Sequence, residues 1–190
     1  GAAHWLQTVA ADEEAARRRL ITERLPELSP AERDALMAGL KRAVDTMMRS
    51  DARRALATAE LMLHIAALTD DPMHRAPGLL ATANIRAIAL GEYEAAAPLY
   101  DEAVRIYQAA GRPVDAARSQ TARIWVLATL GQYDRAIADG LAAAHVLGDA
   151  GDALAEARLT VNLAAIHGRR GDDTASLTRL DRARDIYAGL

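Results

Sequence analysis

Three glycines, Gly91, Gly131 and Gly171, stand 40 residues apart, and each lies in a similar local context. The same spacing aligns many other residues without a gap. These include Ala103, Ala143 and Ala183; Ile106, Val146 and Ile186; Gly111 and Gly151; Ala117 and Ala157; and Arg118 and Arg158. Self-similarity at a fixed period of this length is typical of a solenoid built from stacked helix pairs. The sequence therefore predicts an all-α repeat fold.

The composition also favours helices. Apolar residues make up 51% of the 190 residues, yet aromatic residues account for only 4% and Phe is absent. Ala, Leu, Val and Ile therefore supply most of the apolar side chains, and Ala has the highest intrinsic helix propensity. The length suits one domain or about four repeat units of roughly 40–47 residues.

The periodicity divides the chain into an N-terminal helical segment, a divergent first helix pair and three regular pairs. The segment covers 1–28, the divergent pair 29–75, and the regular pairs 76–113, 114–152 and 153–190. We expect the regular helices at about 76–90, 94–110, 114–130, 134–149, 153–170 and 174–188. The divergent pair aligns with the later pairs at an offset of 41 residues, so that Pro72 corresponds to Pro113. In the N-terminal segment, a helix at 5–25 carries a basic run at 17–19, which we predict to be a solvated helix face.

Each regular unit is expected to be a hairpin of two helices. Gly91, Gly131 or Gly171 ends the first helix, because glycine adopts the left-handed cap conformation at little cost. Small residues then stand where the two helices cross, at Ala96, Ala136 and Ser176. The middle unit departs from this pattern. Gly140 replaces an expected aromatic residue, and Arg123 stands where the next unit has Leu163.

These residues resemble the tetratricopeptide repeat (TPR). The resemblance runs through Gly91, Tyr93, Ala96, Tyr100, Ala103 and Pro113, and through Leu163, Ala164, His167, Gly171, Ser176, Leu180 and Ala183. It covers roughly residues 38–190 and has a period of 40 rather than the commoner 34. The resemblance implies a right-handed α-solenoid of antiparallel helix pairs, and it says little about function.

More narrowly, the chain is similar to the N-terminal repeat region of bacterial TPR proteins that end in a CHAT (caspase-like) protease domain. The similar stretches are 48–56, 117–120 and 149–163. A protease domain of that kind needs a Cys and a His, and this chain has no Cys. The resemblance therefore implies the recognition arm of a larger bacterial protein. A similar array in the sensor half of bacterial multidomain transcription regulators is the alternative.

Several functional classes find no support in the sequence. The net charge of −3 and the pI of about 6.0 give no basic face for nucleic acid and no polybasic patch for a membrane. Neither a spanning segment nor a phosphate-binding loop is evident. The five His show no metal-site spacing, and His167 is expected to be a packed residue. We therefore expect a cytoplasmic protein that is not an enzyme and has neither a cofactor nor a metal.

The remaining expectation is a protein or peptide partner in a concave groove, which the first helix of each pair lines in TPR solenoids. The candidate residues are Asn84, Ile88, Arg118, Thr121, Trp125, Arg158, Asn162 and Arg169. Trp is favoured at binding hot spots, and Arg118 and Arg158 share one register that could face carboxylate groups. Asn162 could bond a peptide backbone.

Other roles for these residues remain open. Trp125 could pack between repeats, and the two arginines could form salt bridges to acids such as Asp115 or Glu156. The last helix ends at Leu190 without a polar capping helix after it. We therefore expect either that the parent protein continues or that another chain covers this end, which would make the chain a homo-oligomer.

Overall fold

The computed structural model describes residues 14–190, and the described part of the chain is helical without strands. The start of the predicted N-terminal helix, including Trp5, lies outside the described residues. The helices form two compact units, Gly1–Glu92 and Tyr93–Leu190. Each unit is considered by itself below.

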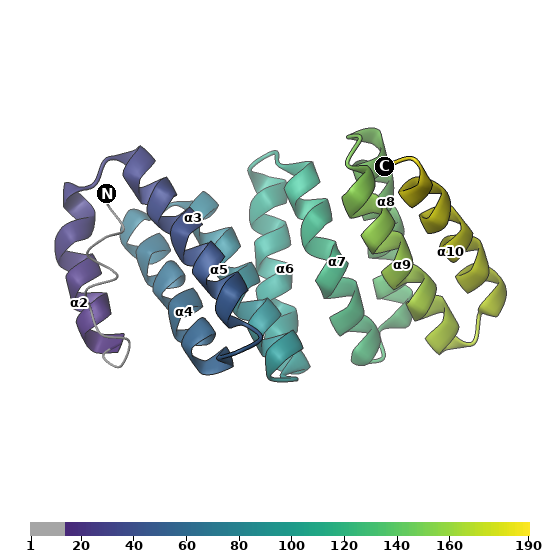
Figure 1. The fold of residues 1–190 in the computed structure, drawn as a ribbon, viewed down its shortest axis with the longest axis horizontal. Coiled ribbons are helices and arrows are strands. Elements are labelled where there is room, and N and C mark those ends of the chain that lie inside the picture. The colour runs from purple at the N-terminus through teal and green to yellow at the C-terminus, as the bar shows by residue number, and fades with distance from the viewer. Residues whose placement is uncertain (1–13) are drawn as a thin grey trace. The chain divides into compact units, whose positions relative to one another are not determined.

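In its described part, the first unit consists of four α-helices and two short helical segments (Figure 1). Its elements are α2 (Glu14–Arg24), η1 (Leu25–Glu27), α3 (Pro30–Met47), α4 (Ala52–Thr69), α5 (Pro72–Asn84) and η2 (Ile85–Ala89). Helix α3 packs against α4 and α5, and α2 packs against α4. The buried side chains that join these helices include Ile21, Leu36, Leu40, Val44, Ala55, Ala59, Met62, Ile65 and Ile85.

Helix α3 begins where the sequence predicts. The Ser29 hydroxyl accepts the Glu32 N–H, and the Glu32 carboxylate accepts the Ser29 N–H at 2.9 Å. This reciprocal capping box satisfies two backbone donors that a helix start leaves unpaired. The hydrogen bonds of the Ser29 side chain and backbone lower the pKa of Glu32.

The basic run at 17–19 is not uniformly solvated, so that prediction was wrong. Arg18 forms ion pairs with Glu14 at 2.7 Å and with Glu60 on α4 at 3.4 Å. Arg17 is half-buried, and of the three arginines only Arg19 is exposed. The sequence did not reveal this because the burial depends on how α2 packs against α4.

Helix α5 begins at Pro72, earlier than the expected start near residue 76. The Asp71 carboxylate accepts the Met73 N–H at 2.7 Å, and Pro72 fits the first helical position. Asp70, just before this cap, adopts a left-handed conformation with φ 51°. The Asp-Asp-Pro sequence therefore both ends α4 and starts α5.

One extra residue explains why the divergent pair is offset by 41 rather than 40. Pro72 and Gly91 are one residue further apart than Pro113 and Gly131. The π-helical segment η2 absorbs this residue, because the Leu90 N–H bonds the carbonyl of Ile85, five residues earlier, at 3.1 Å. A single inserted residue is commonly accommodated in a helix as such a π-bulge.

The second unit contains five consecutive helices, each packed against the next (Figure 1). They are α6 (Tyr93–Ala109), α7 (Pro113–Thr129), α8 (Tyr133–Asp149), α9 (Ala153–Arg170) and α10 (Asp173–Ala188). Helix α7 packs against α6, α8 and α9, while α9 also packs against α8 and α10. Their shared core includes Ile124, Leu127, Ala136, Leu147, Leu159, Leu163 and Ile166.

The repeating glycines end helices in the predicted way. Gly131 and Gly171 have φ values of 79° and 85°, in the left-handed region. The N–H of the next residue then bonds the carbonyl five residues before it, as in Gln132 to Leu127 at 2.8 Å. This arrangement satisfies carbonyl groups at the helix end and reverses the chain for the next helix.

Candidate functional site

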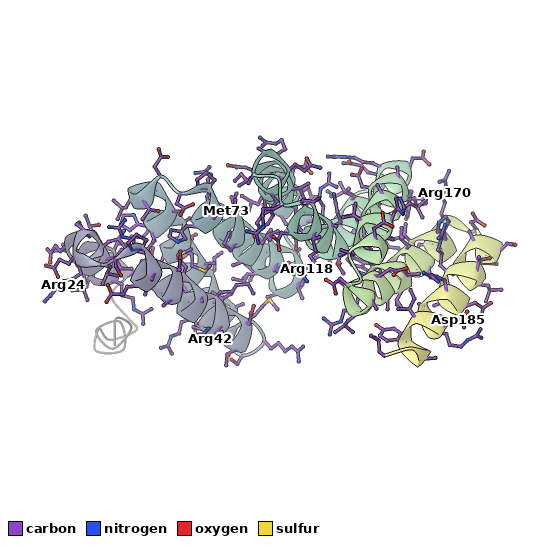
Figure 2. The ribbon with its side chains drawn as sticks, turned by 90° about the horizontal axis from the view of Figure 1, so that it is seen from above. Arg24, Arg42, Met73, Arg118, Arg170 and Asp185 are labelled. Carbon is purple, nitrogen blue, oxygen red and sulfur yellow. The ribbon has the colours of Figure 1, made fainter. Side chains whose placement is uncertain are left out.

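Six of the eight predicted binding residues lie on two neighbouring helices of the second unit. We define the α7/α9 face as Arg118, Thr121 and Trp125 on α7, with Arg158, Asn162 and Arg169 on α9. Figure 2 labels Arg118 on α7 and Arg170 at the end of α9. The two helices pack directly against each other, and contacts between them join Trp125 to Arg169 and Asn162 to Thr121.

Trp125 lies at the surface of this face and contacts Arg169. The indole is 37% exposed, and the Arg169 guanidinium lies 5.0 Å from the ring centroid. A cation at this distance is attracted by the electron-rich face of the ring. Arg169 also donates to the Thr129 hydroxyl at 3.5 Å. The contact fixes the ring between α7 and α9 while leaving more than a third of it accessible.

Arg118 is held by acidic side chains at the start of α9 and in its own helix. Its Nε donates to Oδ2 of Asp152 at 2.6 Å, and its Nη1 lies 3.7 Å from Asp115. The hydrogen bond from Arg118 lowers the pKa of Asp152, and the same bond raises the pKa of Arg118. Arg118 remains exposed, so part of its guanidinium still faces solvent.

Of the two acids predicted as salt-bridge partners, Asp115 is confirmed for Arg118, whereas the Glu156 carboxylate binds Arg182 of α10 at 2.9 Å. The shorter ion pair of Arg118 is formed with Asp152, which the sequence did not indicate. The Asp152 carboxylate also accepts the Ala155 N–H at 3.3 Å and so caps α9. Its position as an N-cap was the signal that could have identified it.

Arg158 differs from Arg118 although the two share a register. Its side chain is exposed and forms no ion pair with any residue that the structure describes. Its charge nevertheless contributes to lowering the pKa of Asp152. Arg158 is therefore a cation on this face whose hydrogen-bonding capacity is still available.

The Asn162 side chain bonds the backbone of Thr121 on the neighbouring helix. The Asn162 Nδ2 donates to the Thr121 carbonyl at 2.8 Å, so this amide donor links α9 to α7. The two residues are 41 apart in sequence, one more than the repeat period. Asn162 therefore joins the two helices instead of presenting both amide hydrogens to a ligand.

The other two predicted residues belong to the Gly1–Glu92 unit. Ile88 is 64% exposed within η2. Asn84, the last residue of α5, is half-buried and already engaged in an interaction. They are thus located on the first helix of their own pair, as the sequence predicted.

Two histidines, His74 and His167, are buried and lie close to acidic side chains. His74 is buried, with Nε2 2.8 Å from Asp34 Oδ1 and Nδ1 3.3 Å from the Thr69 hydroxyl. His167 is also buried and lies 3.4 Å from Asp172. Within residues 14–190, we find no group of three or more side chains suited to hold a metal ion. In the same range, every helix is either too short or too polar to cross a bilayer.

Comparison with solved structures identifies the fold. BtubC (BKLC) from P. vanneervenii matches with a TM-score of 0.72 at 22% identity, over 90% of this chain and 71% of that chain. A putative kinesin light chain from Podosopora anserina with nearly identical TPR-like repeats matches with a TM-score of 0.56. Its identity is 15%, over 94% of this chain and 96% of that chain. The fold is therefore a TPR-like α-solenoid. Neither a family model nor a curated protein matches the chain.

Proposed function

We propose that this chain is a protein-interaction scaffold that binds a peptide or protein on the α7/α9 face. TPR-like folds stack repeats into extended surfaces and generally serve protein–protein interaction. The observation that carries the proposal is the pairing of the exposed residue Trp125 with Arg169. Trp and Arg are the residue types most enriched at binding hot spots.

The charges on this face favour an acidic segment or a terminal carboxylate as the partner. Arg158 has no ion pair among the described residues, and Arg118 is exposed even though Asp152 binds it. An arginine can hold a carboxylate through two parallel hydrogen bonds. An acidic peptide with an apolar side chain would place its carboxylates on Arg158 and its apolar group on Trp125.

The test first selects, from a random display library, the peptide that binds the full chain most tightly. It then measures the affinity of variants of the chain for that peptide. Trp125→Ala and Arg158→Ala should each weaken binding by about tenfold or more, because hot-spot truncations cost about 2 kcal/mol or more. Arg105→Ala, which removes an exposed arginine of α6, is the matched control. Unchanged binding with a lowered melting temperature would show that Trp125 and Arg158 only pack.

We further propose that the chain is the recognition arm of a larger bacterial cytoplasmic protein. Its resemblance to the repeat region of CHAT-domain proteins supports this setting, and a multidomain transcription regulator is the alternative. The coding sequence beyond Leu190 tests both. A caspase-like domain would support the first setting and a DNA-binding helix-turn-helix the second, while a stop codon would contradict both.

The second candidate function is self-association through α10. Its apolar side chains Leu177, Leu180 and Tyr187 are exposed, with Leu177 at 63%. In α8, the residues one repeat earlier than Leu180 and Tyr187 are buried at Gly140 and Leu147. An exposed apolar stripe of this kind often marks a protein contact.

Light scattering on the full chain tests this second function. A homo-oligomer should become monomeric when Leu177 and Leu180 are both changed to Glu. Leu154→Glu, at another exposed leucine, is the control and should leave the mass unchanged. A monomer at all concentrations would contradict self-association.

A further inference from the structure

A cleft between α2 and the start of α4 gathers charged side chains that the proposed function does not use. The cleft has a volume of about 260 Å³. Glu14 and Arg17 line it from α2, and Asp51, Arg53 and Arg54 line it from the beginning of α4. It belongs to the first unit, whereas the α7/α9 face belongs to the second.

The acidic groups of this cleft are already engaged. The Glu14 carboxylate lies 2.7 Å from Arg18 Nη2, in an ion pair one helical turn apart. The Asp51 carboxylate accepts the Arg54 backbone N–H at 3.0 Å and caps α4. Neither carboxylate forms a salt bridge with the arginines that line the cleft.

The three arginines of the cleft, by contrast, lack partners. Among residues 14–190, neither a hydrogen bond nor an ion pair reaches the side chain of Arg17, Arg53 or Arg54. The Arg17 Nε is buried and has its N–H unsatisfied. Buried polar groups in native proteins are nearly always hydrogen-bonded, so this donor is available to an acceptor that none of the described residues supplies.

The local electrostatics favour an anion. Three guanidinium groups, from Arg17, Arg53 and Arg54, line the cleft together with two carboxylates, from Glu14 and Asp51. Among the described residues, one positive charge of the cleft lining is therefore uncompensated. The start of α4 adds the positive end of the helix dipole, which opposes the two arginines of its first turn and attracts an anion.

We propose that this cleft binds the phosphate group of a phosphate monoester. A phosphate monoester carries nearly two negative charges at neutral pH and offers three acceptor oxygens. Guanidinium groups bind such oxygens through paired, charge-assisted hydrogen bonds. A carboxylate, with one charge and two oxygens, would leave part of this donor set unsatisfied. The phosphate belongs either to a free small molecule or to a phosphorylated side chain.

The experiment titrates the full ¹⁵N-labelled chain at low ionic strength with inorganic phosphate, phenyl phosphate and a short phosphoserine peptide. Saturable shifts are expected at the amides of residues 52–54. Arg17→Gln and Arg54→Gln should each weaken binding by about tenfold, because a charge-assisted hydrogen bond is lost. Arg53→Gln provides a third variant if either of these fails to fold, as judged by circular dichroism.

Arg19→Gln is the matched control, because it removes the same charge from α2 at an exposed residue. Its affinity should stay within about twofold of that of the unchanged chain, since the charge it removes is screened by solvent. Equal weakening by this variant, or a lack of saturable binding, would overturn the proposal. Tighter binding of the peptide than of its unphosphorylated form and of phenyl phosphate would identify a phosphorylated protein as the source. Equal affinity for phenyl phosphate and the phosphopeptide would identify a free small molecule.

Discussion

Arg123 of α7 donates a 2.6 Å hydrogen bond from Nη1 to Oδ2 of Asp139 on α8. Its Nε donates to Asp101 of α6, also at 2.6 Å, and the side chain is only 5% exposed. One repeat later, the corresponding residue is Leu163, which packs in the apolar core. An ionic cluster thus joins three helices where the next unit uses a leucine.

The first prediction concerns this cluster. Arg123→Leu should lower the free energy of unfolding by about 2–4 kcal/mol, because it removes the buried cation that two carboxylates share and leaves only the exposed Arg135 near them. The remaining carboxylates are those of Asp101 and Asp139. Urea denaturation followed by circular dichroism measures the change.

Arg135→Leu is the control for this prediction. Arg135 also bonds Asp101, at 3.0 Å, but it is largely exposed. Its loss should cost no more than about 1 kcal/mol, as for other surface ion pairs. The double variant Arg123→Leu with Asp139→Leu should recover part of the stability lost by Arg123→Leu alone. If Arg123→Leu and Arg135→Leu lowered the free energy of unfolding equally, burial would not be what makes the Arg123 ion pairs stabilising.

The second prediction is a dependence of stability on pH through Asp101. Burial raises the pKa of this carboxyl, but hydrogen bonds and charges from Arg123 and Arg135 outweigh burial and lower it overall. The folded chain therefore binds this proton less readily than the unfolded chain, whose Asp has a pKa of about 3.9. The stabilisation that the ionised Asp101 gives to the fold is fully present above the unfolded-state pKa. It is lost as the pH falls through the lower pKa of the folded state.

Urea midpoints between about pH 5 and pH 2 measure this effect, since carboxyl groups of this type titrate there. Asp101→Asn should flatten the profile, because the variant has no carboxyl group to titrate at this site. Asp45→Asn, which alters an exposed acid of α3, is the control. If the urea midpoint of Asp101→Asn fell with pH as steeply as that of the unchanged chain, Asp101 would not be the source of the pH dependence.

The third prediction concerns the end of α4. Asp70 has φ 51°. At the offset of 41 residues it corresponds to Gly111, which has φ 66°. Asp70→Gly should raise the free energy of unfolding by about 0.5–1 kcal/mol. The left-handed conformation costs a side-chain residue about 1–2 kcal/mol, and the flexibility of Gly in the unfolded chain offsets part of that gain. Thermal melting measures the shift.

Asp70→Ala is the matched variant, because it keeps a Cβ but removes the carboxylate. Asp tolerates the left-handed region better than Ala does, so this substitution should lower the melting temperature. If both variants shift the melting temperature in the same direction, backbone conformation is not what limits stability at this position.

Much of the fold could be predicted from the sequence, because glycine caps and small crossing residues act locally and recur with the period. Gly131 and Gly171 illustrate this, since both have the positive φ expected of them. The place of the extra residue before Gly91 could not be predicted. The offset reveals that a residue is inserted, but only the hydrogen bond from Leu90 to Ile85 shows that it forms a π-turn.

The candidate site was less predictable, because its contacts join helices that are distant in sequence. Trp125 could be singled out by type, and it is exposed as that interpretation requires. Its contact with Arg169 and the bond from Asn162 to Thr121 depend on the spacing between α7 and α9. The arginine cleft near Arg17 was missed because a basic run ordinarily lies on a solvated face.

The last prediction concerns the contact between α8 and α9 at Gly140. A Cβ added there would stand 2.6 Å from Leu163 Cδ2 and 3.3 Å from Ile124 Cδ1. Gly140→Ala should therefore lower the free energy of unfolding by about 1–3 kcal/mol through overpacking. Leu163→Ala alone should cost about 2–5 kcal/mol, because it leaves a cavity.

The double variant Gly140→Ala with Leu163→Ala should cost less than the sum of the two single changes, because the shortened side chain makes room for the new methyl group. Urea denaturation of all four chains completes the cycle. Gly39→Ala in α3, where the nearest atom is the end of Arg42 at 3.9 Å, is the control. It should stabilise the chain by up to about 1 kcal/mol through helix propensity. If Gly140→Ala stabilised the chain as well, the close approach of α9 would not be what requires glycine at this position.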